Sequence, residues 1–436
     1  MTGKAAGGKK WWSFAAERPD FRRLWSAQSI SIMGSQVSLI AFPLTALAVL
    51  DARASEVGTL NALSRAPFLL FGIFAGVLID RWRSRRVLII MDWVRAATLL
   101  LIPVLMFSRS LTIEWLFAVA FVVGSCTVFF DIAYQSTLTD VVVAGELLTA
   151  NRWLETSRSI GNMSGPGFAA VLLKAVSAPI AILVDATSYA LSALFVHAIR
   201  APDRRPASRQ GSTIWRDFKA GLRFVGESAF LRWNAAIAAT WNLLTSALIT
   251  IFFVHLESEL KLSSATVAVV VFVGSVGSFL AVLVVARIIA WRGLGWCIVL
   301  SMCVGGLGGL FLAMSSGRSP LAIAALTLGY LLVTAAEPLF NINVISIRQM
   351  ITPAHLMART TGAMRFVVWG TLPIGALTAG FLGDAFGGRT TLAVIGVGFL
   401  VPAAMTFLSP FPRIRTVSDL DIGDSTQESK EGVSSV

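Results

Sequence analysis

The sequence has few charged residues, cysteines and histidines. Only 14% of its 436 residues are Asp, Glu, Lys or Arg, and it has 3 Cys and 3 His. The three cysteines fall in apolar runs without metal-ligand spacing, which favours small core residues. We also find no phosphate-cradling loop, no nucleophile elbow and no soluble domain that could hold one. We therefore expect neither an enzyme nor an ATP-driven protein, and no cofactor.

Long apolar runs dominate what is present. The chain is 56% hydrophobic, with a mean hydropathy of +0.75. A helix needs about 20 apolar residues to cross roughly 30 Å of hydrocarbon. Twelve runs predict an all-α membrane protein with 12 transmembrane helices: 26–49, 57–79, 87–107, 112–137, 153–173, 178–198, 231–254, 265–286, 295–314, 320–346, 361–382 and 390–408.

The basic residues predict the orientation, because Lys and Arg gather on the cytoplasmic side of membrane spans. With twelve spans and both termini cytoplasmic, each external loop carries one basic residue: Arg53, Arg109, Lys174, Lys261, Arg318 and Arg389. This topology and attraction to anionic membrane lipids explain the net charge of +12. We therefore expect no nucleic-acid partner.

One polar interruption divides the spans into six and six. We predict an N-terminal half over 1–198, a cytoplasmic linker over 199–230 and a C-terminal half over 231–410. The linker contains apolar residues at helical spacing among basic ones, which indicates an amphipathic interfacial helix. The tail, 411–436, is rich in Ser, Asp, Glu and Gly, which is typical of disorder.

The loop after the second predicted span combines glycine, acid and arginine. Gly76 permits close helix approach, and Asp80 can cap a neighbouring helix N-terminus. Arg81, Arg85 and Arg86 can hold an inner gate by ion pairing. Simple anchoring on the cytoplasmic side explains the arginines but neither Asp80 nor the glycine, so we favour gating.

The fifth predicted span contains Gly161, Gly165 and Pro166. Glycines and a proline bend a helix, and a packing kink is the alternative interpretation.

These motifs resemble those of a known family. The loop around Asp80 is similar to the signature loop of the major facilitator superfamily, and the Pro166 segment resembles the motif of its antiporters. Further likeness in 21–44, 131–166 and 343–370 is to the drug and proton antiporter branch, also called the transmembrane secretion effector family. That branch includes the enterobactin exporter and macrolide efflux proteins.

The resemblance covers about residues 14 to 415. It implies two six-helix pseudo-repeat halves, alternating access, a monomer and the proton gradient as energy source. It also implies a multi-pass protein of a bacterial inner membrane.

Glu337 is our leading candidate for a proton carrier. Tyr330, Thr334, Glu337 and Asn341 share one face of the tenth predicted span, which we expect to line the substrate cavity. Glu337 lies eleven residues before Arg348, roughly 16 Å along a helix and near the membrane midplane. A structural pair with a nearby arginine is the alternative.

Asp131 is the second proton-coupling candidate. It shares a face with Tyr134 and Gln135, which we predict as cavity residues, but it lies close to the inner end of its span. The resemblance to the major facilitator superfamily, in which an acidic residue here often joins the network of Asp80, implies a gating role in preference to proton carriage, with the arginines of that loop as partners.

Arg65 stands within the second predicted span, where an unpaired arginine is costly. It requires an anion, which we expect to be Glu337, Asp131, Asp185 or the substrate. Asp185 itself is more consistent with a structural role.

Two further polar stripes are typical of cavity-lining helices. In the first span the stripe comprises Gln28, Ser31, Ser35 and Ser38. In the seventh it comprises Asn234, Trp241 and Thr245. Hydrogen bonding between helices would produce the same pattern.

The sequence thus predicts a secondary exporter of small amphipathic or hydrophobic molecules, such as an antibiotic, a drug or a siderophore-like metabolite, with protons as the exchanged ion. An importer or facilitator is the first alternative, and a non-transporting membrane scaffold or receptor is the second. The Pro166 motif argues against the importer, and a scaffold would leave the polar stripes without a continuous cavity.

Overall fold

The computed structural model describes residues 14, 17–72, 82–143, 146–202, 214–315, 317, 319–353 and 356–414. Its regular secondary structure over these residues is helical. The first helices are α2 (Pro19–Leu50), α3 (Ala54–Phe71), α5 (Ser84–Phe107), α6 (Ile113–Val141), α7 (Leu147–Ala175), α8 (Ala178–His197) and α9 (Ile214–Glu227). They are followed by α10 (Ala229–Val254), η2 (His255–Glu259), α11 (Ser264–Arg292), α12 (Leu294–Met314), α13 (Pro320–Ile351), α14 (Met357–Trp369), α15 (Thr371–Phe386), α16 (Gly388–Gly398), α17 (Leu400–Leu408) and η3 (Phe411–Arg413).

Ten helical segments within the described residues are long and apolar enough to cross a membrane. Helix α7 occupies the position of the fifth predicted span but is more polar, and α3 occupies the first part of the second predicted span, whose residues 73–79 lie outside the described ones. The predicted all-α membrane fold is therefore confirmed. The count of twelve spans stays a prediction.

Some helices differ in detail from the predicted spans. The seventh continues beyond Val254 into the π-helical turn η2, whose Glu259 accepts hydrogen bonds from the backbone nitrogens of Gly388 (2.6 Å) and Arg389 (3.3 Å). The last two predicted spans are each two helices, interrupted at Gly370 and Phe399. Apolar runs do not reveal such local breaks.

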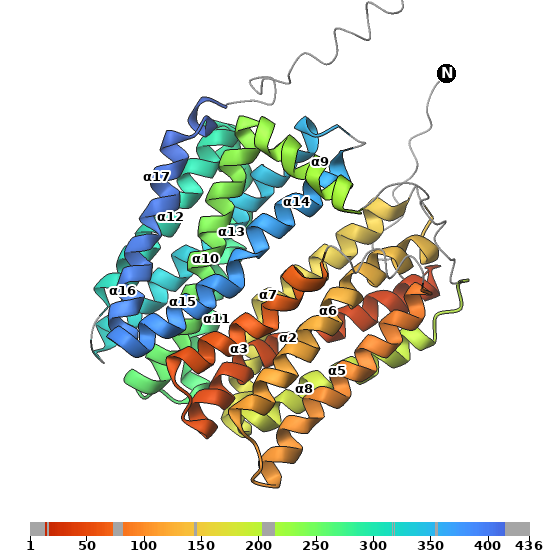
Figure 1. The fold of residues 1–436 in the computed structure, drawn as a ribbon, viewed down its shortest axis with the longest axis vertical. Coiled ribbons are helices and arrows are strands. Elements are labelled where there is room, and N and C mark those ends of the chain that lie inside the picture. Colours follow the sequence, from red (N-terminus) through yellow and green to blue (C-terminus); the bar gives the residue numbers. More distant parts are fainter. Residues whose placement is uncertain are drawn as a thin grey trace, which may run out of the picture.

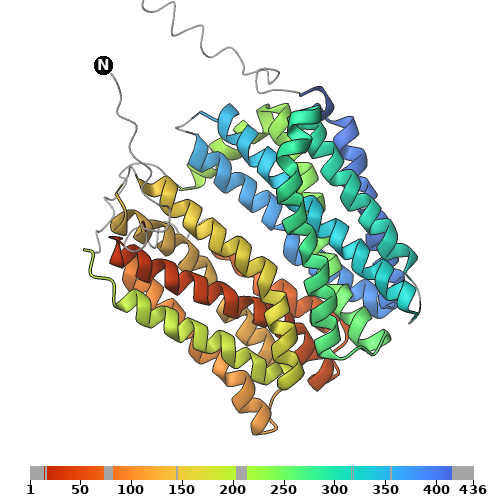
Figure 2. The same cartoon turned by 180° about the vertical axis from the view of Figure 1, so that it is seen from behind.

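The helices form two groups that lie side by side (Figures 1 and 2). We call α2, α3, α5, α6, α7 and α8 the N-terminal group, and α10 to α17 the C-terminal group. Helix α3 packs against α15, and α7 packs against α11, so these pairs join the two groups. The predicted domain boundaries remain predictions.

One end of the bundle, which we call the α9 end, carries α9. Phe218 of α9 packs edge-to-face on Phe366 of α14, with 5.3 Å between ring centroids. Asp20 near the start of α2 accepts a hydrogen bond from the backbone nitrogen of Ala201, just after α8, at 2.8 Å. The described chain thus starts and finishes at the same end of the bundle (Figure 1).

The two groups pack closely toward the opposite end. A Cβ atom added to Gly58 of α3 would lie 2.5 Å from the carbonyl oxygen of Ala376 and 3.0 Å from the Cα of Gly380, both on α15. Asn61 of α3 also donates a 3.0 Å hydrogen bond to Thr250 of α10. Toward the α9 end the two groups of ribbons diverge in both views (Figures 1 and 2).

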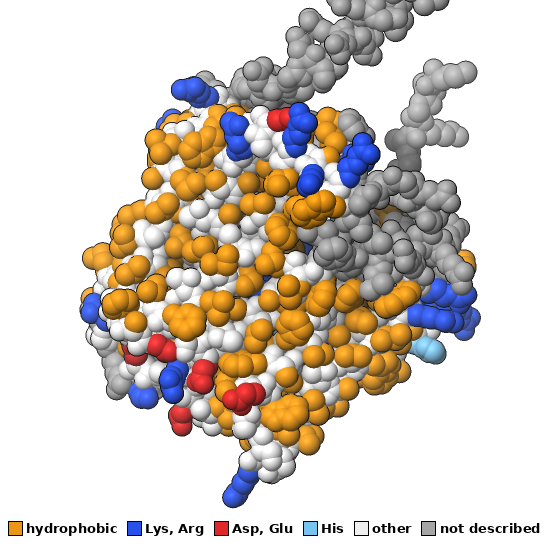
Figure 3. Space-filling view, viewed as in Figure 1, with side chains coloured by type: hydrophobic (Ala, Val, Ile, Leu, Met, Phe, Trp, Pro, Cys, Tyr) orange, Lys and Arg blue, Asp and Glu red, His pale blue; other side chains and the backbone are white. Residues whose placement is uncertain are grey.

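Hydrophobic side chains cover the middle of the bundle surface (Figure 3). Val171 and Phe381, for example, are 69% and 63% exposed. Lys and Arg gather at the α9 end of this face, and the acidic side chains gather mainly at the opposite end (Figure 3). An apolar belt between two charged ends is the surface that a bilayer requires.

Candidate transport site

Arg65 of α3 and Glu337 of α13 form an electrostatic pair between the two helix groups. Each side chain lies within range of the other's charge and is attracted to it, although no side-chain nitrogen of Arg65 comes within 4 Å of a carboxylate oxygen of Glu337. Both side chains are exposed in spite of their mid-helix positions. Of the anions expected for Arg65, the structure therefore selects Glu337.

The predicted stripe around Glu337 divides into two parts. Asn341 is exposed like Glu337, and the Tyr330 hydroxyl lies within electrostatic range of the Glu337 carboxylate. Thr334 instead faces α11, where its Oγ1 donates a 2.7 Å hydrogen bond to the carbonyl oxygen of Gly274. Tyr330 also stacks on Phe252, 4.8 Å between centroids. Glu337 and Asn341 are thus the members of the stripe best placed to meet a solute.

Asp131 of α6 is half-buried and is acted on by three arginines. These are Arg95 of α5, Arg158 of α7 and Arg365 of α14, and the last belongs to the other helix group. The loop arginines that we expected as its partners are not among these three: Arg85 binds backbone oxygens after α8, Arg86 is exposed, and Arg81 lies outside the described residues. Asp131 is therefore a charged link between the groups.

The other predicted members of that face also lie near this link. Gln135 is exposed. The Tyr134 hydroxyl is buried without a hydrogen-bond partner and lies within reach of the charges of Arg158 and Asp131.

Three arginines surround this region near the α9 end. Arg158 and Arg365 are exposed, and Arg348 of α13 is half-buried beside Arg365. Sequence reasoning did not single out Arg158, Arg348 or Arg365. Each lies within about three turns of a helix terminus, where anchoring to lipid would place arginines as well, so the sequence alone does not distinguish a functional role.

A buried polar cluster lies inside the N-terminal group. Asp92 and Arg95 of α5 form an ion pair whose side chains are 0% and 3% exposed. The Arg95 guanidinium lies between the rings of Phe130 and Tyr189, 4.2 and 4.0 Å from their centroids. Asp185 is also within range of the Arg95 charge. Sequence reasoning missed Asp92, although its spacing of three residues from Arg95 is that of a helical ion pair.

Two members of the polar stripe of the first predicted span, Ser35 and Ser38, face this cluster. Ser31 and Ser38 are buried, Gln28 and Ser35 are half-buried, and the Ser35 hydroxyl hydrogen-bonds the Tyr189 hydroxyl at 2.9 Å. The Ser38 hydroxyl lies near the Asp185 carboxylate, but the distance and angles between them do not meet the criteria for a hydrogen bond. For Ser35, hydrogen bonding between helices is thus the observed arrangement.

The stripe of the seventh span lies inside the C-terminal group. Asn234 and Trp241 of α10 are 1% and 3% exposed, and Trp241 packs on Phe399 with centroids 5.0 Å apart. The side-chain polar atoms of Asn234, Trp241 and Thr245 have no hydrogen-bond partner. The structure therefore buries Asn234 and Trp241 in their own group and leaves Thr245 half-buried beside them.

The gating candidates are only partly described. Gly76, Asp80 and Arg81 lie outside the described residues. Arg86 is exposed, and Arg85 donates from Nη1 to the carbonyl oxygens of Ile199 (2.7 Å) and Ala201 (2.9 Å). Arg85 thus ties the start of α5 to the end of α8.

The glycines of α7 provide room for its neighbours. Side chains at Gly161 and Gly165 would collide with Ile32 and Gln36 of α2, and one at Gly167 would meet Phe272 of α11 at 2.9 Å. Pro166 lies inside this continuous helix. The motif therefore packs α7 against both helix groups.

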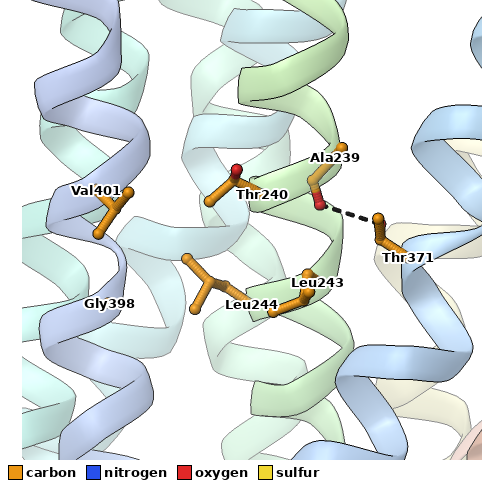
Figure 4. A pocket seen from close by; sticks show the side chains of 7 residues that line it. All are labelled: Ala239, Thr240, Leu243, Leu244, Thr371, Gly398 and Val401. Atoms are coloured by element: carbon orange, nitrogen blue, oxygen red, sulfur yellow. Dashed lines mark hydrogen bonds between the residues drawn. The ribbon is translucent and has the colours of Figure 1, made fainter.

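A pocket of about 230 Å³ lies elsewhere, within the C-terminal group (Figure 4). Ala239, Thr240, Leu243, Leu244, Thr371, Gly398 and Val401 line it. Its two hydroxyls already donate hydrogen bonds, that of Thr240 to Ala236 (2.9 Å) and that of Thr371 to Ala239 (3.0 Å). With mainly aliphatic walls, it offers no specific polar contact to a solute.

Two groups of membrane helices with charges facing one another between them are an arrangement that transporters use. The family model of the Major Facilitator Superfamily matches residues 24–373. The chain belongs to this superfamily and is a transporter, not an enzyme.

Two curated relatives are efflux proteins. The chain is 24% identical over 405 residues to the multidrug efflux pump Tap of Mycolicibacterium fortuitum, covering 88% of this chain and 93% of Tap. It is 23% identical over 183 residues to macrolide efflux protein A of Streptococcus pyogenes, covering 42% of this chain and 45% of that protein. Efflux proteins are thus among its relatives.

Solved structures share the fold. The nucleoside transporter NupG superposes with a TM-score of 0.70 at 15% identity, covering 89% of this chain and 98% of NupG. A bacterial homologue of the human lysosomal transporter Spinster, in an inward-facing and unoccupied conformation, has a TM-score of 0.64 at 15% identity, covering 95% and 99%. These likenesses concern the fold alone.

Proposed function

We propose that the protein is a secondary exporter that moves a small amphipathic molecule out of a bacterial cell in exchange for protons. The pair of exposed, opposite charges between the helix groups, Arg65 and Glu337, carries this proposal. An ionisable side chain at mid-membrane depth is expensive unless it serves transport or has a partner. Glu337 has both a partner and solvent access.

Glu337 is the proton carrier in this proposal. When its carboxylate is charged, attraction to Arg65 holds α13 toward α3. When it is protonated, that attraction is lost and the two groups are free to change their relative position. Protonation is thereby linked to rocking of the groups about the α3–α15 and α7–α11 contacts.

Asp131 acts as a gate residue rather than as the carrier. Its attraction to Arg365 crosses between the groups near the α9 end. When that end closes, the two groups approach and this attraction strengthens. In the proposed orientation the α9 end faces the cytoplasm, because basic residues gather there. Both termini then lie inside, and the protein works as a monomer with twelve spans.

The function of two relatives supports export over import, since Tap and macrolide efflux protein A are efflux proteins. The test is to load cells with a panel of labelled drugs and siderophores and to follow their release with and without an uncoupler. Faster release than in cells without the protein, abolished by the uncoupler, is the expected result. Faster accumulation would favour an importer, and the absence of any effect would favour a scaffold or receptor.

A further inference from the structure

The arginines near the α9 end outnumber the acid that they face. Asp131 attracts both Arg158 and Arg365. Arg348 lies close enough to Arg365 for their positive charges to repel each other. Asp131 is also shared with Arg95. Among the described residues whose charges act on one another here, Asp131 is thus the one acid shared by several arginines.

In the part of the chain that the structure describes, no acidic side chain is in direct contact with these three guanidinium groups. Among the described residues, Arg158, Arg348 and Arg365 have no carboxylate oxygen within 4 Å and donate no side-chain hydrogen bond. The Arg348 Nε is buried and without a partner. A buried guanidinium nitrogen such as the Arg348 Nε is normally paired, because an unpaired buried donor costs free energy.

Aromatic surface lies directly beside these charges. Phe366 and Trp369 of α14 are 36% and 38% exposed, and the Arg365 guanidinium lies 5.3 Å from the centre of the Trp369 ring. Trp369 also meets Phe68 of α3 edge-to-face, at 5.3 Å between centroids, so aromatic surface spans both helix groups. An apolar body can pack here while an acidic group reaches the arginines.

We propose that the exported molecule is an amphipathic organic anion, an aromatic or aliphatic body that bears a carboxylate or phosphate. Arg158, Arg348 and Arg365 form its entry site at the α9 end, and Phe366 and Trp369 hold its apolar part. Guanidinium groups suit this role because their planar donors match carboxylate and phosphate oxygens. The inference rests on the proposed function for the direction of transport, but the entry site itself is independent of it.

The test is calorimetric titration of the purified full-length protein with three probes of matched shape. The probes are 2-naphthylacetate, its neutral amide and 2-(2-naphthyl)ethylammonium. A hydrogen-bonded charge contributes about 1.5–3 kcal/mol, so we expect the acetate to bind at least about tenfold more tightly than the amide. Binding of the acetate, but not of the amide, should weaken as salt rises from about 0.1 to 1 M.

Variants separate charge recognition from packing. Arg365→Gln should weaken acetate binding about tenfold and change amide binding by less than about threefold. Arg365→Lys, which keeps the charge but loses the planar donors, should bind the acetate more tightly than Arg365→Gln and less tightly than the intact protein. The matched control is Arg292→Gln, since Arg292 is also exposed and lies beside a tryptophan ring, 4.4 Å from the centre of Trp291. It should leave acetate binding unchanged.

Three results would overturn the entry site: no acetate binding at millimolar concentration, equal or tighter binding of the amide or ammonium probe, or an equal effect of Arg365→Gln on all three probes. The last would make Arg365 a gate residue only. Uncoupler-sensitive export of neutral or cationic drugs without acetate binding would refute the entry site and leave the exporter. Acetate binding that depends on Arg365, without uncoupler-sensitive export, would support the entry site and refute the proposed exporter.

Discussion

Arg65 of α3 and Glu337 of α13 act on each other across the two helix groups, although both side chains are exposed and not in direct contact. A separated, solvated pair can be strengthened or broken at little cost, unlike a buried ion pair. This relationship makes Glu337 suitable as a group that changes protonation state during a transport cycle.

Removal of either charge should have a similar effect on transport. We expect Arg65→Gln and Glu337→Gln each to lower the export rate by about tenfold, and the double variant to be no slower than the slower single variant, because both changes remove one interaction. Initial rates of export, normalised to the amount of protein in the membrane, provide the measurement. Strictly multiplicative losses would show that the two residues act independently.

Asp131 should behave differently from Glu337. Asp131→Asn removes the charge shared with Arg158 and Arg365 but leaves the Glu337 carboxyl in place. We expect slower export that remains sensitive to an uncoupler. Uncoupler titration of the residual export is the measurement, and export that no longer responds to the uncoupler would move the proton carrier to Asp131.

The Asp92–Arg95 pair should be important for stability. Asp92→Asn leaves Arg95 buried without its carboxylate, at an expected cost of about 3–5 kcal/mol. Thermal unfolding of the purified protein in detergent should show a clear fall in Tm. Asp384→Asn, at an exposed position, serves as the control and should leave Tm unchanged. Equal Tm values for the two variants would remove the Asp92 carboxylate from the stabilising cluster.

Close packing of α3 on α15 should be sensitive to a single methyl group. In Gly58→Ala the new Cβ meets backbone atoms of Ala376 and Gly380, which cannot move away alone. We expect the groups to separate at this end, with lower Tm and slower export. Gly362→Ala, where nothing lies within 4 Å of the added Cβ, is the matched control.

In that control, alanine should be neutral or raise helix stability by up to about 1 kcal/mol. If both alanine variants kept full export and Tm, close α3–α15 packing would not be required.

Much of the fold could be predicted because long apolar runs are a local property of the sequence. Helix α5, for instance, covers the whole of the predicted span 87–107. Breaks such as the one at Gly370 could not be predicted, since they depend on packing in three dimensions. Polar residues of α7, which begins at Leu147, are largely exposed, as Glu155 and Asn162 are, so hydropathy alone does not reveal that this helix packs on α2 and α11.

The candidate site was less accessible from the sequence. Arg65 and Glu337 were recognisable because isolated charges in apolar runs require a partner. The attraction of Asp131 to Arg365 joins residues far apart in the sequence, and only the fold brings them together. Serine stripes such as that of Ser35 were ambiguous because cavity lining and helix packing produce the same spacing.

The most direct test of the central claim is substrate-driven proton movement in everted membrane vesicles. Respiration acidifies the vesicle interior, and a pH-sensitive dye reports proton release when an exported substrate is added. The intact protein should release protons on substrate addition, whereas Glu337→Gln, present at an equal amount, should not. Undiminished proton release by Glu337→Gln would contradict the assignment of Glu337, and no release by the intact protein would contradict proton exchange itself.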